Sequence, residues 1–385
     1  MAFSFLGKDR LFQVVKNPHI DKPKVVILCS YDPSGISTVI DHISAVANIA
    51  WACVEIYNLY YFEDNIKRFN KMYSAISNSD ALIIHNTSCY RLEQRLDLFR
   101  KLNIQNLNIP KILMKQDEQI NPNLTVEFLI ENKFTALTTC MRGEKIRGLY
   151  SKLIDKIEVV SLFSGYIPKQ KPLENKVKSL NRKYMIGYRG DRPRYEYGKI
   201  AFEKYNIGNV FKDYCNKYNI SSSIEMDPSK RILGNAWYSF LSNCKGVLAV
   251  ESGASIVDWD GALFRKLTER GKTTADLIDY NDIYINSEGN FNYTGFSPRI
   301  FETFLAGSVP VLLEGDWEGL LEKDINYLSV NKSYSNLDEI IYKLNNNNLC
   351  LEIINNNVNK FLKNDSFSYV SLERSIKHLL RSIQK

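Results

Sequence analysis

The sequence predicts an α/β protein with two Rossmann-like domains that face each other across a cleft. The chain has 385 residues, which is too long for one ordinary hydrophobic core and suits two domains of roughly 150–200 residues each. Continuous β-branched apolar runs, typical of strands covered on both faces, alternate with amphipathic helical patterns. This alternation begins again in the second half of the chain, after a segment rich in proline and lysine.

The first predicted domain, residues 1–165, has its first clear strand in the run KVVILCS at 24–30. The turn Asp32-Pro33-Ser34-Gly35 follows, and apolar residues then recur every three or four positions from Ile36 to Ile49. That spacing predicts a helix with one apolar face. Further strands are predicted at 51–57, 81–85, 111–115, 134–140 and 157–162. Strands and helices in alternation predict a parallel sheet with helices on both faces.

Residues 166–180 are predicted to be a linker, and residues 181–365 a second domain with strands at 184–188, 246–250 and 309–313. Residues 366–385 are predicted to form an amphipathic C-terminal helix that packs back on the first domain. Open α/β sheets bind ligands at the carboxyl ends of their strands, so we expect the strand-to-helix loops of both domains to line the cleft.

Composition narrows the class of protein. Hydrophobic residues make up 44% of the chain and charged residues 24%, which are globular values. The N-terminus has a charge at Lys8 and no long apolar stretch, so neither a signal peptide nor a membrane span is expected. Seven cysteines without ligand spacing indicate buried thiols in a reducing compartment, and we expect a cytoplasmic protein.

The net charge of +7 is modest for this length. It is compatible with a peripheral position at the anionic inner face of the membrane and with phosphorylated ligands. It is too diffuse to predict binding of nucleic acid, because no basic run is interleaved with aromatic residues in a known motif.

The most informative segment is SPRIFETFLAGSVPVL at 297–312. Ser297 and Pro298 are a favourable N-cap and first helical residue, so a helix begins here with N–H groups that attract phosphate. Arg299 has a planar guanidinium that can bind a diphosphate, and Glu302, one turn later, can accept hydrogen bonds from ribose hydroxyls. The alternative is an ordinary capped helix with a surface Arg–Glu pair.

This segment resembles the nucleotide-binding helix of GT-B glycosyltransferases, most of all exostosin-like and related bacterial surface-polysaccharide enzymes. Their pattern S-P-R-x-x-E, followed by glycine and then P-V, is matched here by Ser297, Pro298, Arg299, Glu302, Gly307, Pro310 and Val311. The resemblance implies that Glu302 holds the nucleotide ribose. It also implies that Arg299 and the helix N-terminus face the diphosphate.

Two further loops follow strands in the second half. Arg189 and Gly190 end the run IGYRG, where similar GT-B enzymes place a phosphate contact, and Glu251, Ser252 and Gly253 form a small-residue turn suited to close approach of a base or phosphate. A solvated basic turn and a plain strand-to-helix turn are the respective alternatives.

Metal binding is not expected, although Asp258 and Asp260 form a DxD pair of the kind that binds divalent cations in the other glycosyltransferase fold. The GT-B resemblance favours carboxylates that are solvated or cap a helix. Retaining GT-B enzymes commonly carry a second glutamate eight residues before the ribose-binding one, where this chain has Thr294, and the nearest acid is Glu288. Retention or inversion of configuration is therefore left open.

The first domain is expected to hold the acceptor and the catalytic base. Asp117, Glu118 and His85 follow predicted strands and are candidates for removing a proton from an acceptor hydroxyl. The two acids are preferred, since His85 also fits a structural role.

Together these features predict an enzyme, a glycosyltransferase that moves a sugar from a nucleoside-diphosphate sugar to a glycan or lipid-linked glycan in bacterial surface polysaccharide synthesis. No cofactor is expected beyond that donor substrate. A GT-B-shaped nucleotide-sugar epimerase and a non-catalytic nucleotide- or glycan-binding protein are the alternatives. A dinucleotide oxidoreductase is disfavoured, because no G-x-G-x-x-G follows the first strand of either domain.

Overall fold

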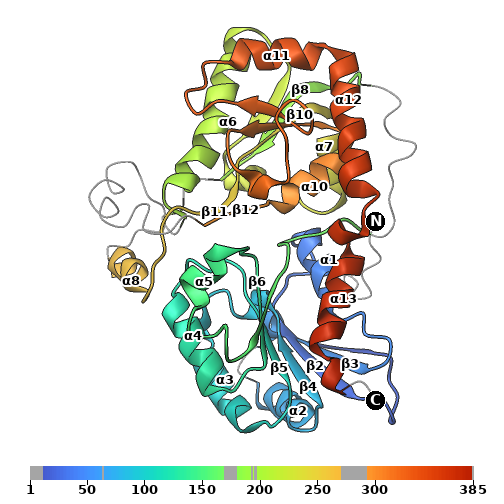
Figure 1. Ribbon diagram of the computed structural model, residues 1–385, viewed down its shortest axis with the longest axis vertical. Coiled ribbons are helices and arrows are strands. Elements are labelled where there is room, and N and C mark those ends of the chain that lie inside the picture. The colour runs from blue at the N-terminus through green and yellow to red at the C-terminus, as the bar shows by residue number, and fades with distance from the viewer. Residues whose placement is uncertain are drawn as a thin grey trace. The chain divides into compact units, whose positions relative to one another are not determined.

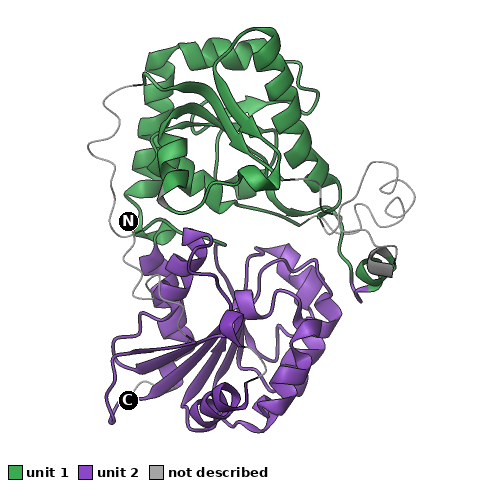
Figure 2. Ribbon diagram, turned by 180° about the vertical axis from the view of Figure 1, so that it is seen from behind, with its two compact units in different colours: residues 1, 164–258, 262–368 green, residues 2–163, 259–261, 369–385 purple. Residues whose placement is uncertain are grey.

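The computed structural model of the protein describes residues 12–62, 65–168, 180–191, 194, 197–269 and 293–383. The chain divides into two compact units, each with its own parallel sheet (Figure 2). The N-terminal unit comprises residues 2–163, 259–261 and 369–385, and the C-terminal unit comprises residues 164–258 and 262–368. Most of the predicted linker, 169–179, lies outside the described residues, as does Glu288.

Within the described residues, a seven-stranded sheet with the order β1-β3-β2-β4-β5-β6-β7 forms the core of the N-terminal unit. Its strands are β1 (Gln13–Lys16), β2 (Lys24–Cys29), β3 (Cys53–Asn58), β4 (Ala81–Ile84), β5 (Lys111–Met114), β6 (Ala136–Thr139) and β7 (Glu158–Ser161). The pairs from β3 to β7 are parallel, which confirms the prediction from the β-branched runs. The edge strand β1 was not predicted, and it pairs antiparallel with β3.

Helices cover both faces of this sheet (Figure 1). They are α1 (Ser37–Val46), α2 (Ile66–Ser77), α3 (Leu96–Lys101), α4 (Pro122–Glu131), α5 (Glu144–Tyr150) and the C-terminal α13 (Tyr369–Leu379). Helix α13 packs against α1, and the Tyr369 hydroxyl donates a hydrogen bond to the Thr38 carbonyl over 3.3 Å. At its other end, His378 Nε2 lies 3.0 Å from a Glu158 carboxylate oxygen at the edge strand β7. The amphipathic pattern of the tail therefore buries its apolar face in the N-terminal unit.

In the described part of the C-terminal unit, five parallel strands have the order β14-β13-β10-β8-β9. They are β8 (Tyr184–Arg189), β9 (Ser222–Glu225), β10 (Cys244–Ala249), β13 (Val309–Leu313) and β14 (Leu328–Val330). The helices are α6 (Lys199–Lys217), α7 (Asn235–Ser242), α8 (Ala262–Glu269), α10 (Pro298–Leu305), α11 (Leu337–Asn345) and α12 (Asn347–Asn357). With the first sheet, this confirms the predicted fold class of two Rossmann-like units.

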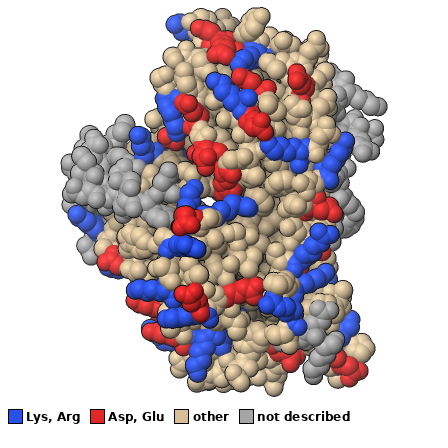
Figure 3. Space-filling view, in the orientation of Figure 1, with Lys and Arg blue, Asp and Glu red and all other residues tan. Residues whose placement is uncertain are grey.

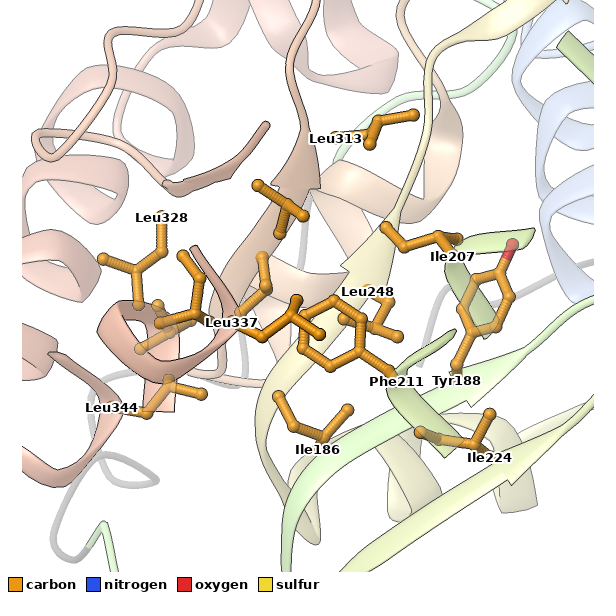
Figure 4. Close-up of a cluster of buried hydrophobic side chains, with 14 of the residues drawn as sticks. Ile186, Tyr188, Ile207, Phe211, Ile224, Leu248, Leu313, Leu328, Leu337 and Leu344 are labelled. Atoms are coloured by element: carbon orange, nitrogen blue, oxygen red, sulfur yellow. The ribbon is translucent and has the colours of Figure 1, made fainter. Parts of the chain in front are cut away.

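Alternation along the strands divides the core of the C-terminal unit into two layers. Leu248 points into a cluster with Phe211 of α6 and Leu344 of α11 (Figure 4), whereas the adjacent Val247 packs with Leu241 of α7 on the opposite face. Successive strand residues point to opposite faces, and each face carries a cluster of buried residues. The sheet is therefore covered on both sides, which leaves the strand ends for a ligand.

A small two-stranded ribbon, β11 (Ser252–Ala254) and β12 (Tyr293–Gly295), lies between β10 and α10 in the chain order. No helix in the described residues is both long enough and apolar enough to cross a bilayer. Among the described residues visible in Figure 3, basic and acidic side chains are interspersed over the face shown, so the positive charge is not gathered into one area there.

Candidate nucleotide-binding site

The order of strands places a topological switch point between β8 and β10 of the C-terminal unit. The chain passes from β8 to its neighbour β9 on one side and then to β10 on the other side. Open α/β sheets bind ligands outside the carboxyl ends of the strands at such a point. At these ends lie Arg189, which is the last residue of β8, and Gly190, which follows it. Val250 and Glu251 follow β10.

Helix α10 begins near this edge as the sequence predicts. Ser297 has extended backbone angles, and its hydroxyl accepts a hydrogen bond from the Arg299 N–H over 3.4 Å. Pro298 occupies the first helical position, where no N–H is needed. The Ile300 N–H donates to the Ser297 carbonyl over 3.0 Å, so the cap residue satisfies the N–H groups of the first turn, and the helix offers a ligand the positive end of its dipole.

Arg299 is half-buried between two aromatic rings. Its guanidinium carbon lies 5.3 Å from the ring centroid of Tyr188 and 5.5 Å from that of Trp237. The Tyr188 ring is itself fixed, because its hydroxyl donates to the Lys204 carbonyl over 2.8 Å. Burial raises the pKa of Tyr188, and the positive charge of Arg299 opposes that rise. Within the described residues no carboxylate lies within ion-pair distance of Arg299, so aromatic faces hold the cation without neutralising it.

Glu302 is half-buried one turn after Arg299, and its Oε2 accepts a 2.8 Å hydrogen bond from the indole Nε1 of Trp237. Residues three apart lie on one side of a helix, so the carboxylate and the guanidinium both meet the Trp237 side chain. Trp237 comes from α7, and no motif in the sequence singled it out. The missing signal was tertiary, because 65 residues separate it from Glu302.

Arg189 has a different place from the one expected. Its Nη1 donates to the carbonyls of Tyr188 and Ser223 over 2.8 Å, and its Nη2 donates to the Ser223 hydroxyl over 3.1 Å. Its guanidinium also lies 4.3 Å from the ring centroid of Phe240. These contacts tie β8 to β9 and α7 and give Arg189 a structural role, and its contact with a diphosphate stays a prediction. A Cβ on Gly190 would collide with the terminal methyl carbon of Met226, so that flexible side chain would have to move.

The turn after β10 also serves the fold of its own unit. Glu251 is buried, and its Oε1 accepts a 2.8 Å hydrogen bond from the Trp317 N–H. Ser252 pairs with Gly295 in the small ribbon, and Gly253 has a φ of 101°. A Cβ on Gly253 would collide with the Tyr293 carbonyl. This glycine therefore permits a close approach of β11 to β12, and a ligand contact at this turn stays a prediction.

Asp258 caps helix α8. One carboxylate oxygen accepts a 3.1 Å hydrogen bond from the Leu263 N–H, and the other accepts a 3.0 Å hydrogen bond from the Phe264 N–H. Among the described residues, no group of three or more His, Cys, Asp or Glu is arranged to hold a metal ion.

The N-terminal unit has a switch point of its own, between β2 and β4. His85, directly after β4, is buried, and its Nε2 lies 2.9 Å from Nδ1 of His42 on α1. The Thr87 hydroxyl accepts from the Ser30 N–H and lies 2.9 Å from His85 Nδ1. The Thr87 hydroxyl can therefore donate its own proton to His85 Nδ1. This network assigns the ring proton of His85 to Nε2, which donates to Nδ1 of His42.

The two candidate acids after β5 differ in exposure. Glu118 is 0% exposed and accepts a hydrogen bond from the Thr139 hydroxyl, so an acceptor molecule does not reach it in this structure. Asp117 is partly exposed in a left-handed backbone conformation with a φ of 55°. Of the expected pair of acids, Asp117 is the more accessible in this structure, and a catalytic role for either acid stays a prediction. His85, 1% exposed, is likewise shielded from an acceptor.

The sequence matches no protein-family model and no curated protein sequence. The structure is similar to that of HepE from Anabaena in complex with UDP and glucose, with a TM-score of 0.50 and 10% identity over 94% of this chain and 100% of HepE. It is similar also to HepE in complex with UDP, with a TM-score of 0.51 and 12% identity over the same shares of both chains. At such identities the likeness establishes a shared fold.

Proposed function

We propose that the protein is a glycosyltransferase that moves a sugar from a nucleoside-diphosphate sugar to a glycan or lipid-linked glycan. The observation that carries the proposal is Arg299, a cation held between two aromatic rings in the first turn of a capped helix. A guanidinium at the positive end of a helix dipole can bind a diphosphate. HepE, which shares the fold, binds UDP, and this supports a nucleotide ligand for the present chain.

The reaction would use this site to stabilise the leaving group. As the bond between the anomeric carbon and the β-phosphate oxygen breaks, both bonding electrons stay on that oxygen and the nucleoside diphosphate gains negative charge. Arg299 and the N-terminus of α10 are pre-organised to receive that charge. Glu302 would accept hydrogen bonds from the ribose hydroxyls and orient the nucleotide along the helix.

The acceptor would bind to the N-terminal unit. The acceptor hydroxyl attacks the anomeric carbon and loses its proton, for which Asp117 is the base that we propose. We further propose that the transfer needs no metal ion or added cofactor. A cytoplasmic enzyme of surface polysaccharide synthesis, working at the inner face of the membrane, fits the composition of the chain.

Titration calorimetry with UDP, GDP, CDP, ADP and TDP tests the nucleotide site. The wild-type protein should bind at least one of them, and Arg299→Ala should weaken that binding about 10- to 150-fold, because a charged hydrogen-bond partner is lost. Glu302→Ala should weaken nucleotide binding to a similar degree and leave the affinity for inorganic pyrophosphate unchanged. Arg100→Ala, at a 73% exposed position in the other unit, is the matched control and should bind normally.

Mass spectrometry of the protein incubated with sugar nucleotides tests the reaction class. Release of the nucleoside diphosphate with transfer of the sugar to an added glycan supports a transferase. An altered sugar that remains on the nucleotide would identify an epimerase. Nucleotide binding without turnover, whichever donor and acceptor are supplied, would identify a non-catalytic binding protein. If no nucleotide binds, the assignment of the site is refuted.

A further inference from the structure

Trp237 contacts both side chains of α10 that the nucleotide site requires. Its indole N–H donates to Glu302 over 2.8 Å, and its ring face lies 5.5 Å from the Arg299 guanidinium. We propose that Trp237 is a positioning residue that gives the site its selectivity for a ribonucleotide, by holding the Glu302 carboxylate in place for the ribose hydroxyls. This inference rests on the proposed function and adds a determinant of ligand specificity to it.

The indole also packs against a ring and, through it, a second cation. The ring of Phe240 stacks on Trp237 with centroids 5.5 Å apart and planes inclined by 27°. The Arg189 guanidinium lies 4.3 Å from the ring centroid of Phe240. Arg189 is in turn fixed to the carbonyls at the end of β8 and β9. These contacts connect the ends of β8 and β9 to the indole of Trp237, and through its N–H to Glu302 of α10.

Holding the carboxylate matters because a glutamate side chain otherwise samples several rotamers. Fixing such a side chain on ligand binding costs conformational entropy and so lowers the affinity. A carboxylate offers about four lone-pair sites, so accepting the indole N–H leaves it able to accept ribose hydroxyls as well. The hydrogen bond to Trp237 therefore orders the carboxylate before the nucleotide arrives.

The arrangement also separates two tasks on one side chain. The indole N–H acts on Glu302, while the ring face acts on Arg299. A phenylalanine at this position keeps an aromatic face for Arg299 and for Phe240 but has no donor. A histidine keeps a ring N–H. These two substitutions can therefore distinguish the donor from the bulk of the side chain.

The test compares UDP and GDP with their 2′,3′-dideoxy counterparts by titration calorimetry, using wild type, Trp237→Phe and Trp237→His. Trp237→Phe should lose about tenfold in affinity for the ribonucleotide and less than twofold for the dideoxy form, because only the former meets Glu302. Inorganic pyrophosphate, which would meet Arg299 and the start of α10 but not Glu302, should bind wild type and Trp237→Phe equally. Trp237→His should recover part of the ribonucleotide affinity.

A merely structural role predicts a different pattern. If Trp237→Phe loses equal affinity for the ribonucleotide, the dideoxy form and pyrophosphate, or loses none, the inference is overturned and the proposed function stands. If the wild type binds neither UDP nor GDP nor any other nucleoside diphosphate, both fail together. Should Trp237→Phe fold poorly by circular dichroism, Trp237→His supplies the second measurement, and a loss that is equal for the ribonucleotide and the dideoxy form would overturn the inference.

Discussion

The buried pair of His42 and His85 should make the stability of the N-terminal unit fall as the pH falls below about 6.5. Burial lowers the pKa of His42 from 6.5 to about 4. Burial and the adjacent His42 lower the pKa of His85 well below 6.5. In this pH range the unfolded chain binds more protons than the folded chain, so stability is present above pH 6.5 and is lost as the pH falls toward 4.

The size of the effect follows from the shift of His42. One pKa unit corresponds to about 1.4 kcal/mol, and at pH 5 an unfolded histidine is almost fully protonated while His42 in the folded chain is mostly neutral. His42 alone should therefore remove about 2 kcal/mol of unfolding free energy between pH 7 and pH 5. His85 adds to this loss, because its pKa is lowered in the same direction.

Urea unfolding at pH 7 and pH 5 measures the loss, with wild type, His42→Asn and the double variant His42→Asn/His85→Asn. The asparagine amide can replace the imidazole Nδ1 as a hydrogen-bonding group and carries no titratable proton. The loss should shrink in the single variant and shrink further in the double variant. His19→Gln is the control at an exposed histidine, and its loss should equal that of the wild type. If the double variant loses as much stability as the wild type, the histidine pair does not titrate on unfolding and the reasoning is refuted.

Three further substitutions test single contacts in the C-terminal unit. Gly253→Ala should destabilise the protein by more than about 1 kcal/mol in thermal unfolding, since its φ of 101° and the Tyr293 carbonyl exclude a Cβ, and an unchanged melting temperature would contradict this placement. Asp258→Ala should lower the free energy of unfolding by about 1 kcal/mol, because the α8 cap is lost. EDTA should leave nucleotide binding by the wild type unchanged. Binding that disappears on chelation and returns with Mn²⁺ would instead assign Asp258 to a metal site. Arg182→Met should cost about 2 kcal/mol in urea unfolding, because the carbonyls of Ser242 and Gly307 lose their donor, and Lys183→Met beside it should cost little.

Much of the fold could be predicted because the relevant signals are local. The run from Lys24 to Cys29 is apolar on both faces, which predicts a strand inside a covered sheet whatever its neighbours are. The cap at Ser297 and the spacing of Arg299 and Glu302 involve residues within two turns of one helix. Capping and helical periodicity depend on positions a few residues apart, so the sequence by itself determined that a capped helix begins there with Arg299 and Glu302 on one side.

The tertiary structure decided which of the candidate side chains are accessible and what they contact. Arg189 and Arg299 look alike as loop and helix-start arginines, yet the first is engaged by carbonyls of β8 and β9, and the second meets two rings. The partner of Glu302 is an indole 65 residues away, and Glu118 is enclosed although its neighbour Asp117 is partly exposed. Such contacts depend on which strands are adjacent in the sheet and on how helices pack across it. Residue spacing along the chain carries no information about that adjacency.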